Sequence, residues 1–159
     1  FEEMLEVGLQ CVRTIHPSFD PIIDRKVARL PKFADSLTLF SDIFFIALDN
    51  IRKHSGLADR PRIWIEAELK GDELRIRIAN EVAHDVRSQK RDEKLLTIRN
   101  RIESGDYLKS VSSEGGTGLI KIRKILGGDN KRLNDYSFGF DNNGCFSVRF
   151  SIRTKEITL

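Results

Sequence analysis

Residues 113–126 read Ser113-Glu114-Gly115-Gly116-Thr117-Gly118-Leu119-Ile120-Lys121-Ile122-Arg123-Lys124-Ile125-Leu126, in which three glycines and a threonine run directly into an apolar-periodic helix. Glycine tolerates positive φ and lets the backbone come close to a ligand, and the helix directs its free N–H groups and positive dipole end at the loop. This arrangement favours an anion, phosphate above all. A short glycine pattern also fits an ordinary loop before a helix, so the interpretation needs a second motif.

The second motif lies upstream, in a predicted helix over residues 36–55. Apolar residues recur there at helical spacing and predict one buried face, made of Leu37, Phe40, Phe44, Leu48 and Ile51. Asn50 lies beside that face, with a carbonyl oxygen suited to hydrated Mg²⁺ and an amide donor suited to phosphate. Lys53 adds a positive charge on the same side, and Gly56 is placed to end the helix. Alone, Asn50 also fits a solvated boundary residue.

The two motifs, in this order and spacing, resemble those of the GHKL ATPases, which include the ATP-binding catalytic domains of sensor histidine kinases. The asparagine box of that superfamily is similar to residues 47–56, ALDNIRKHSG, and its second glycine box to residues 115–126, GGTGLIKIRKIL. Residues 137–152 resemble its terminal β-hairpin. The resemblance covers residues 19–153 and implies an α+β fold, a two-layer α/β sandwich of the Bergerat type with a mixed, largely antiparallel sheet and helices on one face.

The resemblance also implies a ligand, ATP with Mg²⁺, held between the helices under a lid. It gives the metal to Asn50, and it places the nucleotide against Asn50, Lys53, His54, Asn80, Gly115, Gly116, Thr117, Gly118 and Leu119. His54 also stands at a helix end, where its first role is to stabilise the dipole. No residue of this chain is expected to act as a catalytic group.

Two departures from the superfamily pattern bear on activity. Asn80 stands where an Asp-x-Gly-x-Gly box usually begins, and both glycines are missing. An Asn carbonyl can still accept from the adenine amine, but without the strength of a charged acceptor, so weaker adenine binding is expected. Ile46, one turn before Asn50, replaces a residue that is commonly polar and cannot orient water as a general base. Transfer to a histidine needs no such base, because imidazole is itself a nucleophile.

The remaining sequence predicts the other elements of one domain. We expect a helix over 2–15, a strand over 22–28, a hairpin of strands 63–69 and 74–80 turned at Gly71-Asp72, and a lid over 86–112 with a helix through Leu95, Ile98 and Ile102. Four lid cations are expected to be solvated unless one reaches a phosphate: Lys90, Arg91, Arg99 and Arg101. Residues 1–18 are expected to be a helix entering from a preceding region, and residues 19–159 the ATP-binding domain.

Composition sets the wider limits. A chain of 159 residues with 40% hydrophobic residues can bury one full core. The formal net charge of +3 comes from intermixed cations and anions, so no nucleic-acid partner is expected. No apolar run approaches 18 residues, so no membrane contact is expected from this chain. Cys11 and Cys145 are expected to be free thiols in the cytoplasm, and the start at Phe1 indicates a piece of something longer.

Three functions remain open. The first is the ATP–Mg²⁺-binding catalytic domain of a sensor histidine kinase, which presents the γ-phosphate to a histidine on an upstream dimerising helical domain and so serves a response regulator. The second is a nucleotide-dependent conformational module of a larger non-kinase protein. The third is a degenerate copy that binds no nucleotide. His16 precedes Pro17 at a helix end and is a poor phosphoacceptor, while His84 is expected to be a surface residue.

Overall fold

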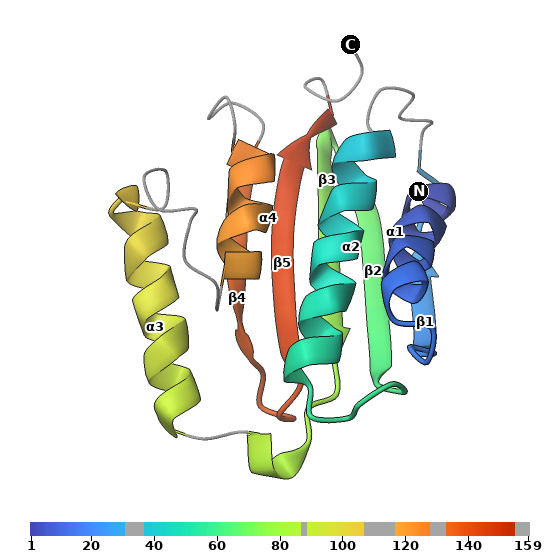
Figure 1. Ribbon diagram of the computed structural model, residues 1–159. Coiled ribbons are helices and arrows are strands. Elements are labelled where there is room, and N and C mark those ends of the chain that lie inside the picture. The colour runs from blue at the N-terminus through green and yellow to red at the C-terminus, as the bar shows by residue number, and fades with distance from the viewer. Residues whose placement is uncertain (31–36, 87–88, 107–116, 128–132, 155–159) are drawn as a thin grey trace.

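The computed structural model describes residues 1–30, 37–86, 89–106, 117–127 and 133–154, in which helices and strands form two layers (Figure 1). The helices are α1 (Glu2–Ile15), α2 (Leu37–His54), α3 (Gln89–Glu103) and α4 (Thr117–Gly127). The strands are β1 (Ile22–Val27), β2 (Arg62–Lys70), β3 (Glu73–Asn80), β4 (Leu133–Phe140) and β5 (Phe146–Arg153). A single 3₁₀ turn at His84–Val86 follows β3.

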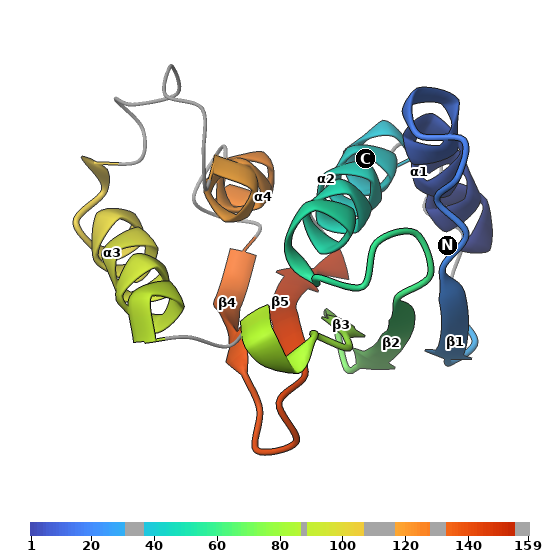
Figure 2. The same cartoon turned by 60° about the horizontal axis from the view of Figure 1, so that its bottom comes forward.

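The strands form one sheet in the order β1-β2-β3-β5-β4. β1 runs parallel to β2, whereas the other neighbouring pairs are antiparallel. β2 and β3 form the predicted hairpin, and Gly71 turns it with a φ of 65°, a conformation that favours glycine. Figure 2 shows α1, α2 and α4 on one face of the sheet, so the predicted α+β sandwich with helices on one face is confirmed.

Alternation along the strands decides which residues face the helices. In β3, Leu74, Ile76 and Ile78 are buried, and Arg75 and Arg77 alternate with them. This period of two is the pattern of a sheet with one covered face. Asn80 continues the buried series at the end of the strand, which places a polar side chain in the layer between sheet and helices.

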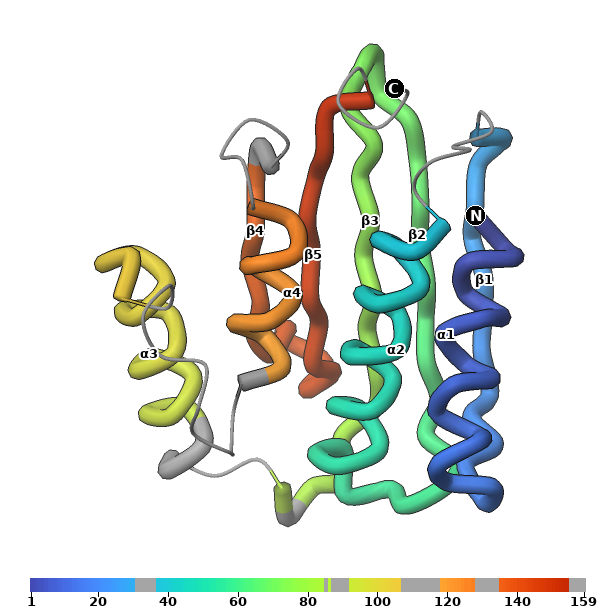
Figure 3. The backbone as a smooth tube through the Cα atoms, turned by 45° about the horizontal axis from the view of Figure 1, so that its top comes forward, coloured from blue at the N-terminus to red at the C-terminus, as the bar shows by residue number. Residues whose placement is uncertain are grey.

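The core is centred on α2. Phe40, Phe44, Leu48 and Ile51 are buried as predicted, but Leu37, which was expected on the same face, is 38% exposed because it is the first residue of α2. α1 packs beside α2 (Figure 3), where a Cβ on Gly8 would lie only 2.7 Å from the Cβ of Phe44. A glycine is therefore required at this helix contact.

α3 lies outside the edge strand β4, beyond α4 (Figure 3). The predicted helix through Leu95, Ile98 and Ile102 is present, and Ile98 is buried. Arg99 is exposed, as expected, and in addition its Nη2 donates to the carbonyl of Phe138 at 3.0 Å and its guanidinium lies 5.5 Å from the centroid of the Phe138 ring. An edge strand presents carbonyls that no further strand uses, and Arg99 binds one of them.

Both cysteines are free, as expected. Among the helices of the described residues, none combines the length and the apolar character that crossing a membrane requires.

Candidate functional site

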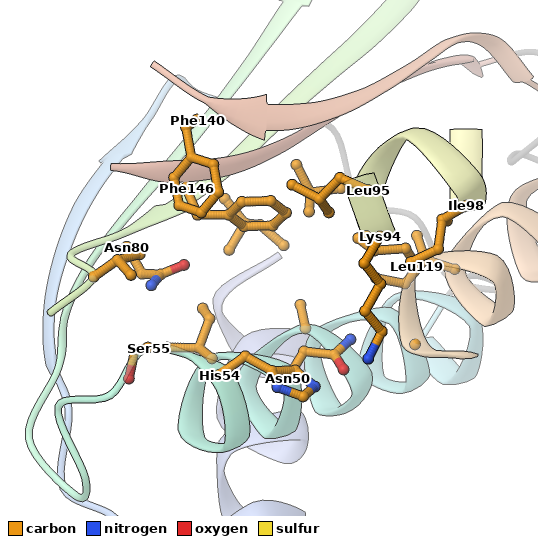
Figure 4. A pocket seen from close by; sticks show the side chains of 17 residues that line it. Asn50, His54, Ser55, Asn80, Lys94, Leu95, Ile98, Leu119, Phe140 and Phe146 are labelled. Carbon is orange, nitrogen blue, oxygen red and sulfur yellow. The ribbon is translucent and has the colours of Figure 1, made fainter. Parts of the chain in front are cut away.

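A cavity of about 110 Å³ lies between the helices and the end of the sheet. Residues of α2, β3, α3, α4 and the β4–β5 hairpin line it. Figure 4 shows side chains from these elements around one space: Asn50, His54, Asn80, Lys94, Leu119 and Phe146. The fold therefore brings residues of both sequence motifs to one cavity.

The closest approach in this cavity joins the two motifs directly. A Cβ built on Gly118 would collide with the side-chain amide of Asn50, so only glycine fits where α4 begins beside α2. The Nδ2 atom of Asn50 is buried and has no hydrogen-bond partner among the described residues. A buried polar group without a partner costs roughly 1–3 kcal/mol. A bound group that accepts a hydrogen bond would remove this cost.

Asn80 presents an acceptor to the same cavity. It is 3% exposed, and its Nδ2 donates to the backbone carbonyl of Glu81 at 2.5 Å. That bond uses one of the two N–H donors of the amide. The side chain points into the cavity with its oxygen on that side (Figure 4), so Oδ1 is an acceptor that Asn80 offers there. An acceptor beside apolar walls suits an amino group on a flat ring.

The walls of the cavity are mainly apolar. Phe140 and Phe146 lie on the two sides of the β4–β5 turn, with ring centroids 5.3 Å apart and planes at 71°. Leu95 and Ile98 from α3 complete the wall. A dry cavity of roughly 150 Å³ lined by Leu, Ile and Phe binds benzene. The cavity, about 110 Å³, is of the same order, so its apolar walls suit contact with a flat ring, while the rest of a larger ligand would lie outside it.

Tyr136 fixes the beginning of α4. Its hydroxyl donates to the carbonyl of Leu119 at 2.7 Å. Burial raises the pKa of Tyr136 far above its ordinary value, and the nearby Arg123 opposes this effect only in part. The hydroxyl therefore keeps its proton at neutral pH and remains a donor. By this bond β4 holds Gly118 and Leu119 beside α2.

Lys53 lies on α2 but does not line the cavity. Its ammonium pairs with the carboxylate of Asp49 at 2.5 Å, and its side chain is 52% exposed. The same carboxylate lies 3.3 Å from Nη2 of Arg52 and 4.0 Å from Nε2 of His16. A contact between Lys53 and phosphate therefore stays a prediction.

The other predicted residues divide into three groups. Asn50, His54, Asn80, Gly118 and Leu119 line the cavity. Thr117 is the first residue of α4, whereas Gly115 and Gly116 lie outside the described residues.

Sequence reasoning missed several residues that line the cavity. Phe140 and Phe146 carried a usable signal, because aromatic residues on both sides of the turn segment Asp141–Cys145 can meet across a hairpin. Ser55 and Lys94 carried no such signal, since their direction depends on how their elements pack. Ile46 does not line the cavity but packs against the core.

No group of three or more His, Cys, Asp or Glu residues that could hold a metal ion occurs in the described part of the chain. Mg²⁺ commonly uses one or two protein oxygens together with phosphates and waters. The amide oxygen of Asn50 fits that kind of shared coordination.

Solved structures of histidine kinases share this fold. The nucleotide-free catalytic domain of histidine kinase ThkA has a TM-score of 0.63 at 15% identity, with 96% of this chain and 90% of that chain covered. The Acinetobacter baumannii histidine kinase AdeS has a TM-score of 0.60 at 12% identity, with 97% and 64% covered. The mycobacterial sensor histidine kinase MprB has a TM-score of 0.53 at 12% identity, with 96% and 93% covered. At these identities the likeness shows the fold alone.

Sequence comparison supplies the family. No match was found among curated proteins. The family model described as "y4jQ C-terminal putative histidine kinase domain" matches residues 1–153, nearly the whole chain. The chain therefore belongs to the y4jQ C-terminal family of histidine-kinase-like domains.

Proposed function

We propose that this chain is an ATP–Mg²⁺-binding catalytic domain that presents the γ-phosphate to a histidine on a separate helical domain. The observation that carries the proposal is the buried amide of Asn50, which lies against Gly118 and has no partner among the described residues. The same cavity combines an inward acceptor on Asn80 with walls suited to a flat ring.

Each end of the cavity has its own role in this proposal. Asn80 accepts from the exocyclic amine of adenine, and Phe146 and Leu95 contact the ring. Asn50 binds Mg²⁺ through its carbonyl oxygen and donates to a phosphate through Nδ2. The bound nucleotide supplies the phosphoryl group, and the metal offsets the charge on its phosphates.

Ile46 favours transfer to histidine over hydrolysis. It provides neither a base nor a hydrogen-bonding group that could orient water. An acceptor imidazole brings its own nucleophilicity, so it can attack the γ-phosphorus while the bond to the β-phosphate oxygen breaks and ADP leaves. The partners of the domain are then an upstream dimerising helical domain that carries the histidine and a response regulator that receives the phosphate.

The same observation about Ile46 also suits a second function. A domain that binds ATP but lacks a means to activate water can act as a nucleotide-dependent conformational module in a larger protein that is no kinase.

Calorimetric titration tests the binding. The wild-type chain and Asn50→Ala are titrated with a non-hydrolysable ATP analogue, with and without Mg²⁺. We expect weak to moderate binding by the wild type and loss of its Mg²⁺-dependent part in the variant. Unfolding free energies should agree within about 1 kcal/mol, because within the described part of the chain the amide nitrogen makes no hydrogen bond that the variant could remove. No heat and no thermal shift at millimolar nucleotide would favour the degenerate copy.

Phosphoryl transfer from γ-labelled ATP separates the two functions. The isolated domain should turn over ATP very slowly, and the protein with its upstream helical region should gain acid-labile label. No label would favour the conformational module. Label that survives acid would place the phosphate on a serine or threonine and would contradict transfer to histidine.

A further inference from the structure

We infer that Lys94 binds the phosphates of the ligand and supplies, from α3, the positive charge that the sequence led us to expect from Lys53. This inference rests on the proposed nucleotide site. It concerns a residue that lies outside both sequence motifs.

The packing of α3 sets the direction of Lys94. Lys94, Leu95 and Ile98 line the cavity. Residues at these spacings share one face of a helix. Ile98 is 6% exposed, and Arg99 binds the carbonyl of Phe138 on β4. With these two contacts in place, α3 cannot rotate Lys94 away from the cavity without exposing Ile98.

The position of Lys94 within the cavity matches the phosphate end. In Figure 4 its side chain extends toward Asn50, on the side of the cavity away from Asn80. A ligand with its base at Asn80 and its metal-bound phosphates at Asn50 therefore directs negative charge toward the Lys94 ammonium. Lysine is a compact charge on a flexible stem and binds phosphate without a fixed geometry.

Charge supports the same assignment. Among the described residues that line the cavity, Lys94 is the one lysine or arginine. Its side chain is exposed, and the ion pairs found among the described residues do not include it. Lys53, in contrast, lies outside the cavity lining and pairs with Asp49. A phosphate can therefore bind Lys94 without breaking an existing ion pair.

Titration of matched variants tests the inference. Wild type, Lys94→Gln, Lys94→Arg, Lys53→Gln and Lys121→Gln are titrated with adenosine and with a non-hydrolysable ATP analogue plus Mg²⁺. Lys121 is an exposed lysine of α4 that does not line the cavity, so it controls for the change in net charge. We expect Lys94→Gln to weaken binding of the ATP analogue about tenfold or more, since it removes a charge-assisted hydrogen bond. Adenosine binding should stay within about twofold, and Lys94→Arg should retain most of the affinity.

Each other outcome has a defined meaning. Equal effects of Lys94→Gln and Lys121→Gln, or a larger effect of Lys53→Gln, would overturn the inference while the proposed site stands. Equal losses for adenosine and the ATP analogue in Lys94→Gln would show that Lys94 acts by packing and would also overturn it. No binding by the wild type would overturn the proposed function, and the inference with it.

Discussion

The two sides of the cavity are held in different ways. Asn50 and Asn80 belong to α2 and β3, elements at the centre of the core, and we call this side the core half. Lys94 and Leu95 belong to α3, and we call this side the peripheral half. α3 is attached beyond the sheet edge through the buried Ile98 and the bond from Arg99.

This difference suggests that core packing mainly sets the free energy of unfolding, while the peripheral half mainly sets the affinity for the ligand. A substitution among the buried packing residues of α2 or β3 changes contacts that the whole fold shares, so it changes the free energy of unfolding, whereas truncation of the Asn50 amide removes little of that packing. A substitution in the peripheral half changes one wall of the cavity, so it changes affinity more than stability. Gly118 lies at the boundary between the two, because α4 carries it and Asn50 contacts it.

The largest effect should come from Gly8→Leu, which disturbs the packing of α1 against α2, the helix that carries Asn50. A side chain there meets the Cβ of Phe44 at 2.7 Å and the backbone nitrogen of Phe45 at 2.9 Å. We expect the free energy of unfolding to fall by about 3 kcal/mol, at the upper end of the usual cost of overpacking. Urea titration followed by circular dichroism measures it.

Val7→Leu is the matched control, because Val7 is 40% exposed on the same helix. It should change stability by no more than about 0.5 kcal/mol. A similar loss in both variants would show that the contact between α1 and α2 is not tight at Gly8.

The next largest effect should come from Gly118→Ala, and it should appear in nucleotide affinity rather than in stability. The added methyl group would displace the amide of Asn50, which can move without displacing backbone. We expect affinity for the Mg²⁺-bound ATP analogue to fall about tenfold, since about 1.4 kcal/mol of contact is lost. Stability should change by less than about 1 kcal/mol. Unchanged affinity in calorimetry would mean that the position of Asn50 does not matter for the ligand.

The smallest effect should come from Arg99→Gln in the peripheral half. The variant loses the bond to the Phe138 carbonyl and the contact with its ring. We expect a loss of nucleotide affinity of about threefold and faster amide hydrogen exchange in α3, with global stability changed by about 1 kcal/mol or less.

Leu96→Gln controls for this change, because Leu96 is 52% exposed on the same helix. Faster exchange throughout the sheet in Arg99→Gln would contradict the division into two halves.

The sequence predicted the core half better than the peripheral half, for a physical reason. Asn50 follows from helical periodicity, and Asn80 from the end of a strand with alternating residues, because both patterns are local. Lys94 depends on the rotation of α3 about its axis, which the long-range contacts of Ile98 and Arg99 set. Lys53 has the right spacing for the site, but its ammonium forms an ion pair with the carboxylate of Asp49.

The contact of Asn50 with Gly118 likewise depends on long-range packing, which the sequence alone does not predict. The two motifs were recognised in sequence, but only the fold shows that a side chain at position 118 would displace the amide. The aromatic pair of Phe140 and Phe146 could have been inferred from the hairpin. That this pair lines the cavity could not have been inferred, because the cavity exists only where α3 packs beside the hairpin.

The most direct test of the central claim is a nuclear magnetic resonance titration of the isotope-labelled chain with the Mg²⁺-bound ATP analogue. We expect saturable shifts of the amide groups of Asn50, Asn80 and Gly118, and none at Arg75 and Arg149 on the uncovered face of the sheet. Saturable binding with shifts confined to the uncovered face, or no shifts at millimolar nucleotide, would contradict the account.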